Sequence, residues 1–248
     1  MIATIAWREL RNLLISPLGW SALALVQLVQ GLIFYRLVQA YQAAPVVEGA
    51  NAGITYNVAA LLLGSTGYVA LLLVPVLTMH LISGERRRRT LPLLMTAPVA
   101  ARQIILGKYA GVAAYLALML VLVALMPVFL LTGTSLDLGL LLSAWVGTLL
   151  LLWTYAALGL LMSALAPRPA AAAVSAIAVL LLWWLLQMLA ATGIAPLDRL
   201  LAYVSLFAHY EPMLRGTVDS GDLAYFAILI GVLLGLSIVR LDHLRTRS

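Results

Sequence analysis

The residues that could carry chemistry are few, and they lack the spacing of a catalytic or metal site. No cysteine occurs among the 248 residues, which excludes disulfides and thiolate metal ligands. The three histidines are far apart in sequence: His80, His209 and His243. The pair Gly107-Lys108 is followed by Tyr109 and lacks the upstream glycine of a phosphate-binding loop. We therefore expect no metal, no cofactor and no catalytic residue in this chain.

The most informative segment, residues 83–103, combines a very basic stretch with apolar residues. Thr90 can cap a short helix that has Pro92 in its first turn, and Pro98 would end that helix. The apolar side chains of that helix need lipid headgroups or a partner protein to cover them. A simpler alternative is that the arginines only fix the topology and bind anionic lipid. The candidate interface residues are Glu85, Arg86, Arg87, Arg88, Arg89, Thr90, Leu91, Leu93, Leu94, Met95 and Pro98.

A second candidate segment, residues 195–222, mixes charged residues with apolar and aromatic ones. This composition suits a helix that dips into the membrane interface. The segment could form an outer gate or docking surface, or it could be an anchor packed on the spans, which we favour. The candidate gate or docking residues are His209, Glu211, Arg215, Asp219 and Asp222.

Long apolar runs must position these two segments. Hydrophobic residues make up 64% of the chain and charged residues 10%, whereas an ordinary soluble domain has about 25% charged residues. The apolar residues cluster in runs of roughly 20, the length that a helix needs to cross a bilayer. The sequence predicts an all-α polytopic membrane protein with a single transmembrane domain, residues 1–248. The six predicted spans are residues 18–38, 58–82, 104–131, 138–165, 171–191 and 223–239.

The basic residues predict which ends of the spans face the cytoplasm. Twelve of the 15 lie before the first span, between the second and third, between the fourth and fifth, or after the sixth, with Lys108 counted at the start of the third. The positive-inside rule places these segments and both termini in the cytoplasm. Residues 1–17 predict an amphipathic helix on the inner leaflet, separated from the first span by Pro17. That helix is either a simple anchor or part of a coupling mechanism.

Three motifs, in order along nearly the whole chain, resemble a known family. The first comprises Glu85, Thr90, Leu91, Leu93, Leu94, Pro98, Leu106, Gly107 and Lys108. The second is Arg8-Glu9-Leu10 followed by Ser16-Pro17-Leu18, and the third is His209-Tyr210-Glu211 followed by residues 215–226. Together with six spans, they resemble the membrane subunits of type-2 ABC exporters, especially the gliding-motility-type permeases. The chain has Arg89 where that family often has glycine.

The resemblance implies a function and a set of partners. In that family the helix between the second and third spans is a coupling helix, seated in a groove of a cytoplasmic ATPase. We therefore expect a permease subunit in a bacterial plasma membrane that borrows its energy from two ATPase subunits, which would bind ATP and Mg²⁺. A second copy of the chain or a related permease would pair with it, and an accessory subunit with a periplasmic domain could join. No nucleic acid partner is expected.

The sequence also bears on three other classes of membrane protein. The spans contain almost no ionisable residue at mid-depth, which argues against an ion-coupled transporter or a channel. An intramembrane serine protease would need a histidine facing Ser65, but His80 lies about four turns away on the same helix. A non-transporting membrane scaffold or assembly factor stays open as the alternative, because its packing and topology would look the same.

Overall fold

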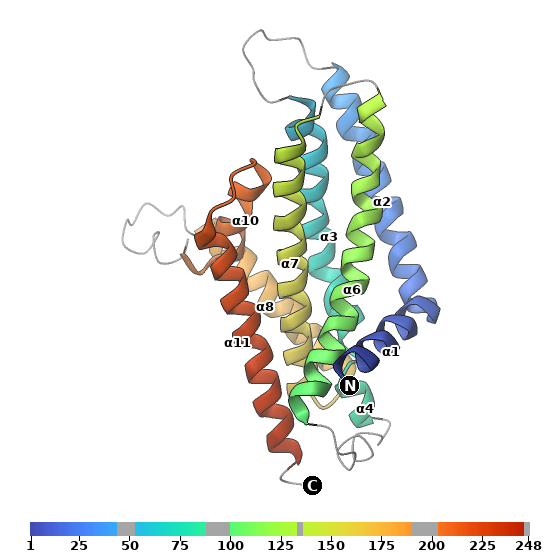
Figure 1. Cartoon of the computed structure of the whole chain (residues 1–248), viewed down its shortest axis with the longest axis vertical. Helices are drawn as coiled ribbons and strands as arrows, with labels where there is room; N and C mark the ends of the chain where they lie inside the picture. The colour runs from blue at the N-terminus through green and yellow to red at the C-terminus, as the bar shows by residue number, and fades with distance from the viewer. Residues whose placement is uncertain (44–52, 88–99, 133–135, 190–202, 246–248) are drawn as a thin grey trace.

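The computed structural model describes residues 1–43, 53–87, 100–132, 136–189 and 203–245, and in these ranges every regular element is a helix. Six stretches of helix are long and apolar enough to cross a membrane (Figure 1). The predicted all-helical fold with six spans is therefore confirmed. The elements are α1 (Ile2–Ile15), α2 (Pro17–Ala43), the π-helix η1 (Thr55–Ala60), α3 (Leu61–Thr78), α4 (Ser83–Arg87), α6 (Ala101–Val128), the 3-10 helix η2 (Phe129–Thr132), α7 (Leu138–Leu165), α8 (Pro169–Leu189), α10 (Leu206–Leu214) and α11 (Ser220–Arg245).

The long helices differ from the predicted spans mainly at their ends. α2 continues to Ala43 and α11 to Arg245, past the predicted span ends at residues 38 and 239, because a helix can run on into the polar interface. The second span differs more. It begins as a π-helix, and α3 ends at Thr78 rather than at residue 82, so that the chain turns before α4 begins.

A break at Ser16 and Pro17 separates α1 from α2. Ser16 is extended, with ψ 141°, and its Oγ accepts a hydrogen bond from the Gly19 amide at 3.0 Å. Proline suits the first position of α2, because the amide it lacks would have no partner in the helix. As a result α1 lies across the ends of the spans (Figure 1). It exposes Trp7 and Ile15, side chains that suit a membrane interface.

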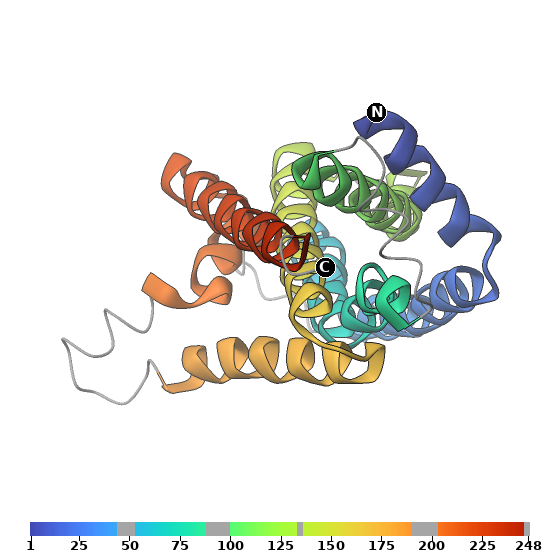
Figure 2. The ribbon, with the colours of Figure 1, turned by 90° about the horizontal axis from the view of Figure 1, so that it is seen from below.

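α7 is the central helix of the bundle. It packs against α3, α6, α8, α10 and α11, and most of its side chains are buried. Seen along the bundle, α8 is strongly inclined to the other spans (Figure 2). Asp137 caps α7 by accepting hydrogen bonds from the amides of Gly139 and Leu140, at 2.9 Å and 3.2 Å. α7 therefore connects the end of the molecule near α4 with the end near α10.

The short helix α10 is held against α7 and α3 by buried polar contacts. The Tyr210 hydroxyl donates to the Leu63 carbonyl at 3.1 Å and lies 2.8 Å from Thr148 Oγ1. Ser143 Oγ donates to the Met213 carbonyl at 2.7 Å. Burial raises the pKa of Tyr210 above its ordinary value, so its hydroxyl stays neutral and keeps its proton for donation. These contacts fix α10 although it is too short to be stable alone.

We predict that Tyr210→Phe lowers the stability of the protein by about 1 kcal/mol, because the buried hydroxyl makes hydrogen bonds that phenylalanine cannot replace. The measurement is the midpoint of thermal unfolding in detergent. Tyr35→Phe is the matched control, since Tyr35 is exposed and its hydroxyl bonds only Gln39 in the part of the chain that is described. Equal midpoints for the two variants would contradict this role of Tyr210.

Candidate functional site

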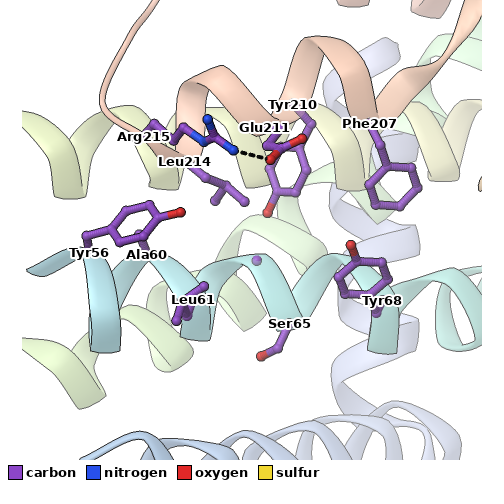
Figure 3. A pocket seen from close by; sticks show the side chains of 11 residues that line it. Tyr56, Ala60, Leu61, Ser65, Tyr68, Phe207, Tyr210, Glu211, Leu214 and Arg215 are labelled. Atoms are coloured by element: carbon purple, nitrogen blue, oxygen red, sulfur yellow. Dashed lines mark hydrogen bonds and ion pairs between the residues drawn. The ribbon is translucent and has the colours of Figure 1, made fainter. Parts of the chain in front are cut away.

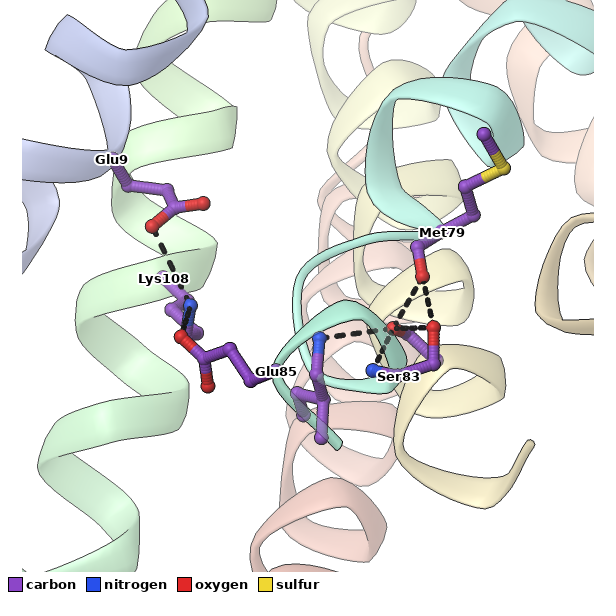
Figure 4. Close-up of polar contacts among 7 residues, drawn as sticks. Glu9, Met79, Ser83, Glu85 and Lys108 are labelled. Carbon is purple, nitrogen blue, oxygen red and sulfur yellow. Dashed lines mark hydrogen bonds and ion pairs between the residues drawn. The ribbon is translucent and has the colours of Figure 1, made fainter. Parts of the chain in front are cut away.

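The chain turns sharply between α3 and α4, and α7 holds this turn in place. Ser163 of α7 accepts hydrogen bonds from the backbone amides of Ile82 and Ser83, at 3.0 Å and 3.1 Å (Figure 4). The same hydroxyl donates to the Met79 carbonyl at 2.9 Å. The amides at the start of a helix have no partner within it, so Ser163 satisfies them from another helix. One side chain thus fixes the start of the segment that the sequence singles out.

The N-terminal helix α1 lies directly on the first turns of α6. A Cβ at Gly107 would lie 2.7 Å from Ile5 Cβ. A Cβ at Gly111 would likewise lie 2.7 Å from Glu9 Cβ. Two non-bonded carbon atoms do not come that close in folded proteins, so α1 can approach α6 this closely only because both positions are glycine. Two small residues four apart on one helix make such a close contact in membranes. The contact brings Glu9 next to Lys108.

Lys108 is buried at the point where α1, α4 and α6 meet. Its Nζ lies 2.8 Å from Glu85 Oε1 and 3.4 Å from Glu9 Oε2 (Figure 4). The lysine side chain is 2% exposed, while those of Glu9 and Glu85 are 14% and 19% exposed. We call these three residues the Lys108 cluster. It joins residues that are 99 and 23 positions apart in sequence.

Electrostatic attraction between the Lys108 ammonium and the two carboxylates holds the Lys108 cluster together, and all three side chains are largely shielded from water. An ammonium group away from water needs opposite charge and acceptors for its three N–H bonds. Glu9 or Glu85 alone would provide fewer acceptors for these N–H bonds than the two carboxylates together. Breaking such a pair by removing one partner is costly, because the other charge stays buried. The cluster therefore resists separation of α1, α4 and α6.

The structure brings together only part of the predicted interface of residues 83–103. Glu85 pairs with Lys108, Arg86 is half-buried and Arg87 is exposed, all within α4. The remaining predicted residues lie outside the described ranges: Arg88, Arg89, Thr90, Leu91, Leu93, Leu94, Met95 and Pro98. The predicted coupling helix over Thr90 to Met95 therefore stays a prediction.

The five predicted outer residues fall into three separate contacts rather than one site. Glu211 and Arg215 form an ion pair at 2.5 Å along α10, on the side facing α3 (Figure 3). His209 Nδ1 lies 2.7 Å from Asp222 Oδ1, which joins α10 to α11. Asp219 Oδ1 accepts from the Gly221 amide at 3.2 Å and caps the start of α11.

The contact around His209 anchors the helices of the outer segment to each other. Its Nε2 lies 3.1 Å from the Tyr203 carbonyl, and its ring stacks on Tyr225 at 4.0 Å between centroids. Two acceptors, this carbonyl and the Asp222 carboxylate, thus face the two ring nitrogens. The favoured interpretation of this segment, an anchor packed on the spans, stays a prediction.

Sequence reasoning missed Glu9 and Lys108 as partners. It used Lys108 only as a topological charge and as part of a motif, and Glu9 only as part of another motif. One sequence feature could have predicted an ion pair here: Lys108 lies among apolar residues near the start of a span, and a charge in such a place needs a partner. Which partner it takes depends on how α1 crosses α6.

In the described ranges, no group of three or more His, Asp or Glu residues could hold a metal.

The sequence of the whole chain matches one known protein family. The family model described as ABC-2 family transporter protein matches residues 3–243, which includes α1, the turn into α4 and the outer segment. The chain belongs to this family. It is a multi-pass membrane protein and a permease subunit of an ABC transporter, a class in which a separate subunit is the ATPase. No curated protein shows significant similarity to the chain. The closer resemblance to gliding-motility-type permeases stays a prediction.

We predict that Lys108→Met destabilises the permease by about 3 kcal/mol, because the carboxylates of Glu9 and Glu85 then lose the buried cation that lies between them. Thermal unfolding in detergent measures the loss. Limited trypsin digestion should also show faster cleavage at Arg8 and Arg11, since α1 is no longer held on α6.

The matched control is Arg102→Met, which removes an exposed cation from the same helix. It should change neither readout, because exposed charges contribute little. Adding Glu9→Gln to Lys108→Met should restore part of the stability by removing one unpaired charge. If Lys108→Met unfolds at the same temperature as Arg102→Met, the cluster does not hold the three helices together.

Proposed function

We propose that this permease subunit couples ATP hydrolysis, by a separate cytoplasmic ABC ATPase, to substrate export or force transmission across the bacterial inner membrane. The Lys108 cluster carries the proposal. It links α4, the start of the segment predicted to contact the ATPase, to α6 and to α1. ATP and Mg²⁺ would be bound by the ATPase, and this chain would act by moving and not by catalysing.

The orientation that we propose puts the Lys108 cluster on the cytoplasmic side. α1, α4 and the C-terminal end of α11 lie at the same end of the molecule (Figure 1). This end carries most of the arginines, and the positive-inside rule assigns such an end to the cytoplasm. Both termini then face the cytoplasm, and α10 lies toward the periplasm.

A continuous path of packed contacts would transmit movement from the ATPase. A shift of α4 would pull α6 and α1 through Lys108, and it would pull α7 through Ser163. α7 in turn touches α10 through Ser143 and Thr148. Rigid helices that move as units are an established means of carrying a switch across a protein. The path therefore runs from the proposed ATPase contact to the outer segment.

The complete transporter that we propose has two permease subunits and two ATPase subunits. A single bundle is too thin to enclose a path, and two related subunits around a symmetry axis would form one at their seam. The partner permease would be a second copy or a related chain, and an accessory subunit with a periplasmic domain could join. Large apolar side chains are exposed on α2 and α11, including Leu28, Leu32, Ile228 and Leu236, and lipid or the partner would cover them.

We predict that the double variant Leu91→Asp/Leu94→Asp loses its ATPase while it still inserts into the membrane. Charged residues in the predicted apolar contact would be buried without partners on docking. The tagged chain is purified from membranes, and the amount of ATPase and the ATP hydrolysis that accompany it are measured. Val218→Asp is the matched control, because it places the same charge at an exposed apolar residue between α10 and α11.

Full ATPase recovery with the double variant would contradict the proposed contact. A native chain that never carries a nucleotide-hydrolysing partner in stoichiometric amount would instead identify a non-transporting scaffold.

A further inference from the structure

A pocket of about 330 Å³ lies between α3 and α10, beside the contact that Tyr210 makes with Thr148 of α7. Its walls combine charged and aromatic residues (Figure 3). The ion pair Glu211–Arg215 lies on α10, and Tyr56 and Tyr68 face it from the η1–α3 helix. Phe207 stacks on Tyr68 with ring centroids 5.3 Å apart. A mixed polar and aromatic lining of this kind suits a ligand that has a charged head.

The pocket lies near the end of the bundle where α7 begins. A Cβ at Gly216, the residue after Arg215, would lie 3.4 Å from Leu140 in the first turn of α7. Glu211 precedes Arg215, the C-cap of α10, by four residues, about 6 Å along a helix axis. Arg215 and Glu211 are 62% and 50% exposed. Tyr56 and Tyr68 line the same pocket, and tyrosine is a side chain enriched at the headgroup level of a bilayer.

Two residues of the pocket lining, Leu61 and Tyr68, belong to an apolar stripe on α3. Leu61, Tyr68 and Leu72 are exposed, and they follow the spacing of one helical face, i, i+7 and i+11. The half-buried Ser65 lies between them, and its Oγ donates to Gln30 Oε1 of α2 at 2.9 Å, so α2 borders the stripe at this point. A ligand whose head fills the pocket could lay a hydrocarbon chain along this stripe. The site therefore fits an amphiphile better than a small soluble ion.

The charges of the pocket specify the head of that amphiphile. The guanidinium of Arg215 has five N–H donors and the Glu211 carboxylate has two oxygens, so their mutual contact leaves groups for a ligand. Arg215 matches a phosphate. Glu211 beside tyrosine rings matches an ammonium group. A primary ammonium can donate hydrogen bonds to the carboxylate, whereas a choline head cannot, and an anionic lipid would offer Glu211 no cation.

We propose that this pocket binds a phospholipid of the phosphatidylethanolamine type. The phosphate lies on Arg215, the primary ammonium lies on Glu211, and an acyl chain follows Leu61, Tyr68 and Leu72. This inference goes beyond the coupling function and needs neither nucleotide nor an ATPase. Its failure would therefore leave the proposed function untouched.

The test is native mass spectrometry of the delipidated permease, titrated with lipids of equal chain length. We expect phosphatidylethanolamine to bind about tenfold more tightly than phosphatidylcholine, because only the former donates charge-assisted hydrogen bonds to Glu211. Glu211→Gln should abolish this preference. Arg215→Gln should weaken both lipids. Arg36→Gln, which removes an exposed arginine from α2 outside the pocket, is the matched control and should change neither.

Three results would overturn the proposal. The first is equal binding of the two zwitterionic lipids by the native protein, which needs no variant to interpret. The second is tighter binding of phosphatidylglycerol than of phosphatidylethanolamine. The third is competition by soluble O-phosphoethanolamine at the lipid's own concentration, which would show that the head alone is the ligand and that the lipid is not its source.

Discussion

The buried ammonium of Lys108 is the constraint on which the rest of the structure depends. A charge that is 2% exposed at the edge of a membrane protein must be matched by opposite charge. Glu9 and Glu85 supply that charge, but only if α1 lies on α6 and α4 turns back toward it. The two close glycine contacts of α6 and the turn held by Ser163 are what make these positions reachable. Electrostatics and packing thus define the same geometry.

Buried hydroxyl groups also hold neighbouring helices at both ends of α7. Ser163 fixes the turn into α4, and Ser143 and Thr148 hold α10. Such hydroxyls join helices in a membrane because few other partners exist there. α7 therefore has defined contacts at both ends, as an element that transmits motion requires. The proposed lipid pocket lies beside this outer contact, so a bound headgroup would rest on the same helix, α10, that α7 would move.

Much of the fold could be predicted from the sequence, because it follows from local patterns. Apolar runs gave six spans, and Pro17 marked the break between α1 and α2, since proline begins a helix more easily than it continues one. The site was less accessible. Glu85 was found through its basic neighbours, but its pairing with Lys108 depends on a turn and on a helix crossing that no local pattern encodes. The outer residues His209, Glu211 and Asp219 looked like one cluster in sequence and make three separate contacts in space.

The most direct test of the account asks whether α1 and α4 keep a fixed distance from each other, as their shared contact with Lys108 requires. The chain has no cysteine, so Arg11→Cys and Arg87→Cys, both at exposed positions, can carry a pair of spin labels without background. The distance between the labels is measured by double electron–electron resonance in the complete transporter, with and without ATP and Mg²⁺. The account predicts one narrow distance that nucleotide does not change, and a broadened one in Lys108→Met. A distance that changes with nucleotide in the native cluster, or that stays narrow in Lys108→Met, would contradict it.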